Sequence, residues 1–229
     1  MTTVEPGTVL PPQPRAVAWL QLRGVAWPVV GGLSAVAAVA GAGGIAGRGS
    51  ASALLPIAFA LLAAAAAFLL DEPASAVVDV TPTGPAHRTA VRALALLVPL
   101  AVGSGLVLAF ALGQPRPSWP AVTLTLAGNV LLGFAIACVA RRRTGEPGPF
   151  AAAAVVAVLV VPGLLPSASR WVHTFPAATP DRHGLPATTC WWIIGAGCAV
   201  AISGALISPG RLWPRRRLSP GRRPGPRGA

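Results

Sequence analysis

Charged residues divide this chain into apolar runs of nearly equal length, and this spacing restricts its fold more than any other feature. The uncharged runs lie between Arg23 and Arg48, then up to Asp71, between Arg92 and Arg116, then up to Arg141, between Glu146 and Arg170, and from about Pro186 to Gly210. Each run holds about 20 to 25 residues, and a helix needs about 20 apolar residues to cross a bilayer core of about 30 Å. The spacing therefore predicts six membrane-spanning helices.

The composition is also that of a membrane protein. Of the 229 residues, 54% are hydrophobic and only 10% are charged, whereas a soluble domain carries about 25% charged residues. The formal net charge of +12 would fit a nucleic-acid partner. The charges lie in the gaps between apolar runs, however, so orientation in the membrane explains them. We expect a multi-pass protein of the cell membrane with the lipid bilayer as its partner and no nucleic acid.

The predicted fold class is an all-α integral membrane protein. The six helices are expected at about 25–47, 51–70, 92–113, 120–140, 150–166 and 189–208, within a transmembrane domain of residues 24–208. A disordered leader, residues 1–23, and a disordered basic tail, residues 209–229, are expected to flank this domain. The fifth run is the shortest and contains Pro162, which is expected to kink it or to end it early.

The distribution of arginine predicts the orientation of the helices. All 18 basic residues are arginine, and an inside N-terminus places 14 of them in the cytoplasm. Only Arg48, Arg116, Arg170 and Arg182 are then outside. The positive-inside rule therefore favours cytoplasmic N- and C-termini, a cytoplasmic loop over residues 71–91 and an outer loop over residues 167–188.

The cytoplasmic loop combines acids with the pattern of a short helix. Asp71, Glu72 and Asp79 are three of the six carboxylates in the chain. An acid at position 71 or 72 can cap a helix that starts at Pro73. Apolar positions follow at helical spacing, and Pro82 ends the pattern. One interpretation is an ordinary capped loop whose arginines set the topology; the other is a binding element.

The second interpretation comes from a resemblance. The six-helix plan and the loop pattern Glu72, Val78-Asp79, Thr81-Pro82, Arg88 and Arg92 resemble the permease subunits of ATP-binding-cassette exporters. In that family the corresponding loop forms a coupling helix that docks on a separate ATPase. The resemblance implies an ATPase partner and a homodimer, or a pair with a similar permease subunit. It also implies a coupling surface formed by Asp71, Glu72, Val77, Val78, Asp79, Pro82 and Arg88.

No pattern in the sequence indicates catalysis, a cofactor or a metal. Without lysine the chain cannot carry the GxxxxGK[ST] phosphate-binding motif, so any ATPase must be another chain. His173, Asp181, His183 and Cys190 lie in or near the outer loop but match no compact metal motif. Ser104 lies between two glycines, yet no predicted helix holds a histidine that could activate it. The chain is therefore not expected to be an enzyme.

The predicted helices carry no internal carboxylate or arginine, which argues against proton-coupled transport and fits transport driven by a partner. Small residues at helical spacing, such as Gly43 with Gly47 and Gly133 with Ala137, allow helices to approach closely within or between chains. The alternative function is a stand-alone membrane scaffold or accessory protein that has no ATPase.

Overall fold

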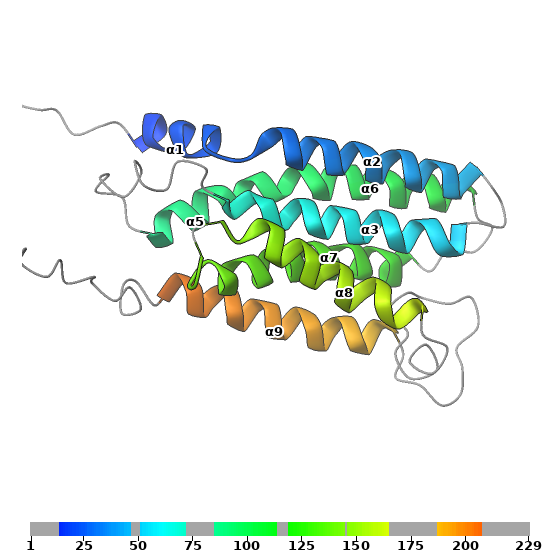
Figure 1. Ribbon diagram of the computed structural model, residues 1–229. Helices are drawn as coiled ribbons and strands as arrows, with labels where there is room; N and C mark the ends of the chain where they lie inside the picture. The colour runs from blue at the N-terminus through cyan, green and yellow to red at the C-terminus, as the bar shows by residue number, and fades with distance from the viewer. Residues whose placement is uncertain are drawn as a thin grey trace, which may run out of the picture.

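The computed structural model describes residues 14–46, 51–71, 85–113, 119–144, 146–164 and 187–207, and these ranges are helical apart from short turns. Within them, six apolar segments run antiparallel to their neighbours along the chain and form one bundle (Figure 1). They are α2 (Trp27–Ala46), α3 (Ala51–Ala67) with the 3-10 turn η1 (Phe68–Leu70), α6 (Leu97–Gly113), α7 (Trp119–Ala140), α8 (Gly148–Leu164) and α9 (Ala187–Ile207). The prediction of an all-α protein is confirmed.

Four of the described helices are long and apolar enough to cross a membrane. These candidate spans are Trp27–Ala46, Ala86–Leu112, Pro120–Ala140 and Thr189–Ile207. Two shorter apolar helices, Leu54–Leu70 and Gly148–Leu159, accompany them. The chain therefore has the character of a multi-pass membrane protein.

The bounds of five predicted helices agree with the structure to within two residues at each end. Pro162 does not end the fifth helix early, because α8 continues to Leu164. The agreement follows from the charge spacing, because the helices end where apolar side chains give way to charged and turn-forming ones.

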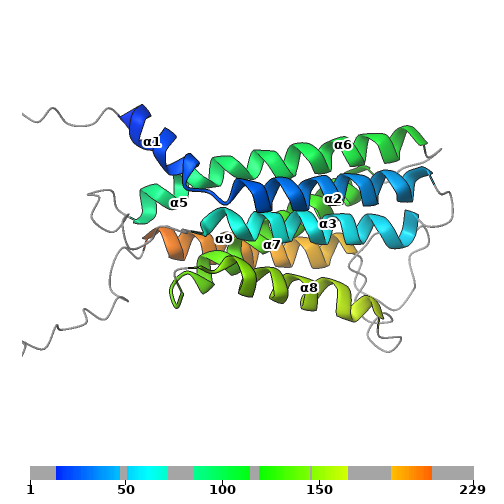
Figure 2. The same ribbon diagram turned by 45° about the horizontal axis from the view of Figure 1, so that its top comes forward.

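Helix α3 lies at the centre of the bundle, between α2 on one side and α8 on the other, and also packs against α6 and α7 (Figure 2). The run Ala63–Ala67 is buried, and its small side chains allow the neighbouring helices to approach. Gly133 of α7 lies directly against Ala63, where a β-carbon would overlap the backbone carbonyl group. The Gly133 and Ala137 pair thus serves packing within the chain.

The outer helices are held by fewer contacts. Helix α9 packs mainly on α7, where Trp191 is only 1% exposed and its indole ring covers Gly128. Apart from Cys198, α9 beyond this contact is partly or fully exposed, and Trp192, Ile193 and Val200 are among the exposed residues. An apolar helix with so much exposed surface is expected to face lipid.

The N-terminal segment differs from the prediction, because Pro14–Arg23 forms a helix, α1, where no structure was expected in residues 1–23. A helix of ten residues is rarely stable alone, so contacts with other parts of the chain supply the missing stability. Helix α1 packs against α5, and the indole Nε1 of Trp27 donates a hydrogen bond to the Leu22 carbonyl oxygen at 2.7 Å. Residues 1–13 lie outside the described ranges.

The third predicted helix also begins earlier, at Pro85 instead of residue 92. Helix α5 (Pro85–Ala93) and the 3-10 turn η2 (Leu94–Leu96) precede α6. Proline suits the first position of a helix, which explains the start of α5. Pro99 cannot donate a hydrogen bond to the Ala95 carbonyl and crowds it, which explains the tighter turn at residues 94–96.

Candidate functional site: the charged end of the bundle

All charged residues in the described ranges lie at one end of the bundle, the end where α1 and α5 are found (Figure 1). They comprise Arg15, Arg23, Arg88, Arg92, Arg141, Arg142 and Arg143, with the carboxylates Asp71 and Glu146. This is the end that the arginine distribution predicts to be cytoplasmic. A positively charged end on an apolar bundle fits the positive-inside rule.

Asp71 caps a helix that is distant from it in the sequence. The residue follows η1 with extended backbone angles, φ −64° and ψ 133°. Its Oδ1 accepts a hydrogen bond from the backbone N–H of Gly148, the first residue of α8, at 2.5 Å. The first N–H groups of a helix have no partner inside it, and a carboxylate there also interacts favourably with the helix dipole. Asp71 therefore ties the end of α3 to the start of α8.

Glycine at position 148 makes this contact possible. A β-carbon on Gly148 would overlap both Oδ2 of Asp71 and the ring of Phe68. Gly148 is buried, and Asp71 is only 7% exposed. The carboxylate thus faces the backbone of α8 and not the solvent.

Arg92 holds the other end of the loop against the same point. Its Nη1 donates hydrogen bonds to the carbonyl oxygens of Leu70, at 3.2 Å, and Asp71, at 3.1 Å. Carbonyl groups at a helix C-terminus lack partners within the helix and carry partial negative charge, so a guanidinium group stabilises them. Because Arg92 lies on α5 and is only 3% exposed, it connects α5 to the end of α3.

Two other polar side chains of α5 also face the interior, whereas His87 is exposed. Arg88 lies one turn before Arg92 on the same face of the helix, and both Arg88 and Thr89 are buried. The hydroxyl of Thr89 accepts a hydrogen bond from Nη1 of Arg141 at 3.4 Å. Helix α5 is therefore linked to the end of α7 as well as to α3.

Burial is the main influence on the ionisation of Asp71, and it raises the pKa of this carboxyl group. The hydrogen bond from Gly148 opposes this shift, the charge of Glu146 adds to it and the charge of Arg92 opposes it. A raised pKa means that the folded chain holds this proton more tightly than the unfolded chain does. Ionisation of Asp71 therefore lowers the stability of the fold as the pH rises above about 4.

The structure describes two of the seven residues of the expected coupling surface. Asp71 and Arg88 are buried at the charged end of the bundle. The other five, Glu72, Val77, Val78, Asp79 and Pro82, lie outside the described residues. Of the possible metal ligands in the outer loop, only Cys190 is described, on α9. The described ranges hold no group of three His, Cys, Asp or Glu residues that could bind a metal ion.

Sequence reasoning did not identify Gly148 and Arg92 as the partners of the loop ends. The sequence around position 148 did indicate a helix start, because Pro147 and Gly148 precede an apolar run and a helix needs a cap there. Its partner is 77 residues earlier in the chain, and no local pattern connects the two positions.

Comparisons of this chain with protein-family models, with curated proteins and with solved structures found no match. Its function must be inferred from its own residues and geometry.

Proposed function

We propose that this chain is the membrane-spanning permease subunit of an ATP-binding-cassette exporter and couples to a separate ATPase through the cytoplasmic loop 71–91. The observation that carries the proposal is the fixation of both ends of this loop. Asp71 is bonded to the start of α8, and Arg92 is bonded to the end of α3 and η1. A loop that passes a partner's movement into a bundle needs firm connections to the helices at both ends.

The elements joined to the loop favour this role. Helix α3 contacts α2, α6, α7 and α8, so a displacement at its end acts on most of the bundle. Asp71 and Arg92 add α8 and α5 to the same junction. A push on residues 72–84 would therefore reach several helices together, as coupling to an external ATPase requires.

In this proposal all six apolar helices cross the cell membrane, with both termini in the cytoplasm. The continuous run from Ala51 to Leu70 is about 30 Å long at helical rise, which matches the bilayer core. Helix α8, with 17 residues, is about 25 Å long. Local thinning of the bilayer accommodates a short helix of this kind at modest cost.

The remaining parts of the proposed assembly are other chains. Two permease subunits, either two copies or this chain with a similar one, form the translocation path. The ATPase supplies the energy, so this chain performs no catalysis and needs no cofactor. The apolar character of the described helices fits an apolar or amphiphilic cargo.

The test is to purify the full chain from its native membranes in a mild detergent and to measure ATP hydrolysis that elutes with it. The proposal predicts hydrolysis with the wild type and its loss with Glu72→Arg or Val78→Asp, while membrane insertion stays normal. Removal of one member of a buried charge pair at an interface costs about 2–5 kcal/mol, which weakens docking more than about tenfold.

The matched control is Glu146→Arg, which makes the same charge change at an exposed acid on the same end of the bundle. This variant should retain the co-eluting hydrolysis. Wild-type preparations without ATP hydrolysis, or loop variants that retain as much of it as the control, would contradict the permease proposal.

A specific observation favours the alternative, a stand-alone scaffold or accessory protein. The buried Asp71 carboxylate is accounted for by its hydrogen bond inside the chain, and Arg88 is buried as well. These two residues therefore need no partner to explain them. If no ATPase elutes with the wild type, the loop is a capped connector and the accessory role becomes the better account.

A further inference from the structure

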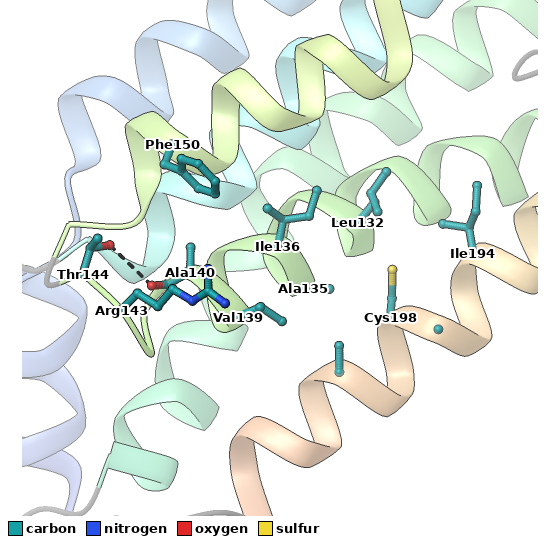
Figure 3. Close-up of a pocket in the computed structure, with 12 residues that line it drawn as sticks. Leu132, Ala135, Ile136, Val139, Ala140, Arg143, Thr144, Phe150, Ile194 and Cys198 are labelled. Carbon is teal, nitrogen blue, oxygen red and sulfur yellow. Dashed lines mark hydrogen bonds between the residues drawn. The ribbon is translucent and has the colours of Figure 1, made fainter. Parts of the chain in front are cut away.

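A cavity of about 570 Å³ lies between α7, the start of α8 and α9 (Figure 3). Helices α8 and α9 both pack against α7, and the cavity is lined from all three. Its wall is mainly apolar and includes Leu132, Ile136, Val139, Phe150, Ile194 and Cys198. A site of this size falls within the range of about 300–1,000 Å³ typical of small-molecule pockets.

The cavity covers less than half of the length of α7 and of α9. Its lining residues on α7 run from Leu132 to Ala140, about 12 Å along the helix, and those on α9 run from Ile194 to Ala201, about 10 Å. One leaflet of a bilayer core measures about 15 Å, half of the full thickness. The length of the cavity therefore matches the depth of a single leaflet, and on α7 it lies in the half of the helix that ends at the charged end.

Cationic side chains stand at the charged end of the cavity. Arg143 and Thr144 complete the lining there, and Arg142 and Arg143 are both exposed. The Thr144 hydroxyl donates to the Ala140 carbonyl oxygen at 3.4 Å, which completes the last turn of α7. Among the described residues, no carboxylate forms an ion pair with the guanidinium group of Arg143. The cavity thus combines an apolar wall with positive charge at one end.

We propose that this cavity binds an anionic phospholipid of the cytoplasmic leaflet. One acyl chain lies along α7 and α9, and the phosphate group lies at Arg143, with Arg142 beside it. Charge complementarity and depth identify the occupant, because an anionic lipid carries its charge where the arginines are and its acyl chain where the wall is apolar. The lipid fills the space between α8 and α9 and so holds the sparsely packed α9 in the bundle.

The volume argues against a helix of a second copy as the occupant. An α-helix about 10–12 Å across fills roughly 400–600 Å³ in each turn, so the cavity would hold about one turn. A helix from another subunit would need a groove along most of its length. A single acyl chain needs only the apolar channel.

The experiment uses the full chain in nanodiscs that contain equal amounts of phosphatidylglycerol and phosphatidylcholine. Native mass spectrometry then measures which lipids remain bound after release. The wild type should retain one phosphatidylglycerol in preference to phosphatidylcholine. Arg143→Gln should lower that preference about fivefold, the effect of one basic residue at an anionic surface. Arg23→Gln removes the same charge from an exposed site on α1 and should leave the preference unchanged.

A second pair of variants tests the apolar wall of the cavity. Gly197 lines the cavity, and a β-carbon at this position meets no atom within 4 Å, so the side chain of Gly197→Leu begins in open space at the cavity. It should reduce the retention of both lipids. Gly195→Leu is the matched control, because Gly195 has equal room on the same helix but does not line the cavity. This control should retain the lipid.

Three results would overturn the proposal. The first is the same lipid preference in Arg143→Gln and Arg23→Gln, or the same retention in Gly197→Leu and Gly195→Leu. The second is displacement of the bound species by millimolar inorganic phosphate, which would identify a site for a free anion. The third is a dimer that dissociates in Gly197→Leu but not in Gly195→Leu, which would show that a second copy fills the cavity. The lipid result does not depend on an ATPase partner, so it can succeed or fail separately from the permease proposal.

Discussion

Replacement of Asp71 by leucine should lower the free energy of unfolding by about 1–3 kcal/mol. Leucine has the same branching and number of side-chain heavy atoms as aspartate but no hydrogen-bond acceptor, so the backbone N–H of Gly148 loses its only side-chain partner among the described residues. Gly148 is buried, and an unsatisfied buried donor costs about 1–3 kcal/mol. Loss of a helix cap gives a similar range, about 0.5–2 kcal/mol. The two energy ranges describe the same contact, so they are not added.

Asp71→Asn should change the free energy of unfolding by less than about 1 kcal/mol. The amide oxygen can still accept the hydrogen bond from Gly148. The lost charge removes a favourable interaction with the helix dipole, about 0.3–1 kcal/mol. It also removes the desolvation cost that raises the pKa of Asp71. The hydrogen bonds from Arg92 go to backbone carbonyl groups, so both variants retain them.

The assay is reversible unfolding of the purified chain in mixed micelles, with increasing dodecyl sulfate and circular dichroism as the signal. Glu146→Gln is the control, because Glu146 is an exposed acid near the same junction and a surface change of this kind usually alters stability by less than about 0.5 kcal/mol. A leucine variant as stable as this control would refute the structural role of the bond. An asparagine variant as unstable as the leucine variant would show that charge, and not the acceptor, is what matters.

Three further predictions concern packing, pH and assembly. Gly133→Val should destabilise the bundle by about 1–3 kcal/mol, because its side chain would overlap the backbone at Ala63. Gly43→Val is the control and should change the same unfolding curve little, because a β-carbon on Gly43 meets no atom within 4 Å. Because burial raises the pKa of Asp71, wild-type stability should fall more steeply than that of Asp71→Asn as the pH rises above about 4; equal slopes in micelle unfolding at several pH values would contradict this. Two permease subunits form the proposed path, so mass measurement in nanodiscs should detect a dimer of this chain or a pair with a similar one; monomers at all concentrations would count against the permease proposal and not against the helical bundle.

The helices were predictable because their limits are set by local chemistry. Membrane-spanning segments must be apolar over about 20 residues, and the charged residues on either side mark their ends. Helix α1 was not predicted, and the third helix was given a start at residue 92, because neither α1 nor α5 is apolar enough to be recognised in this way. Their stability comes from contacts between distant segments, such as the packing of α1 on α5 and the hydrogen bond from Trp27 to Leu22.

The site was predictable only in part. The sequence indicated that an acid at position 71 or 72 caps a helix starting at Pro73, which lies outside the described residues. The structure shows that Asp71 caps the start of α8. A pairing over 77 residues depends on how α3 and α8 pack, which no short pattern records. The small residues at Gly133 and Ala137 likewise indicated close helix contact without showing that α3 is the partner.

The cavity between α7, α8 and α9 could not be inferred from the sequence. Its walls are ordinary apolar positions, and similar residues on other helices pack against one another. The space lies between α7, the start of α8 and α9, and it depends on how these three helices pack. Arg142 and Arg143 appeared in the sequence as topology signals alone, and the structure places Arg143 at the end of an apolar cavity.

The orientation of the charged end underlies both the ATPase and the lipid proposals, and reporter fusions measure it directly. A reporter that is active only in the cytoplasm can be fused after Gly145, between α7 and α8, and after Ala178, between α8 and α9. The account predicts a cytoplasmic signal at Gly145 and an external one at Ala178, as a membrane-spanning α8 requires. The same side for both positions would show that α8 does not cross the membrane, and an external Gly145 would contradict a cytoplasmic loop 71–91.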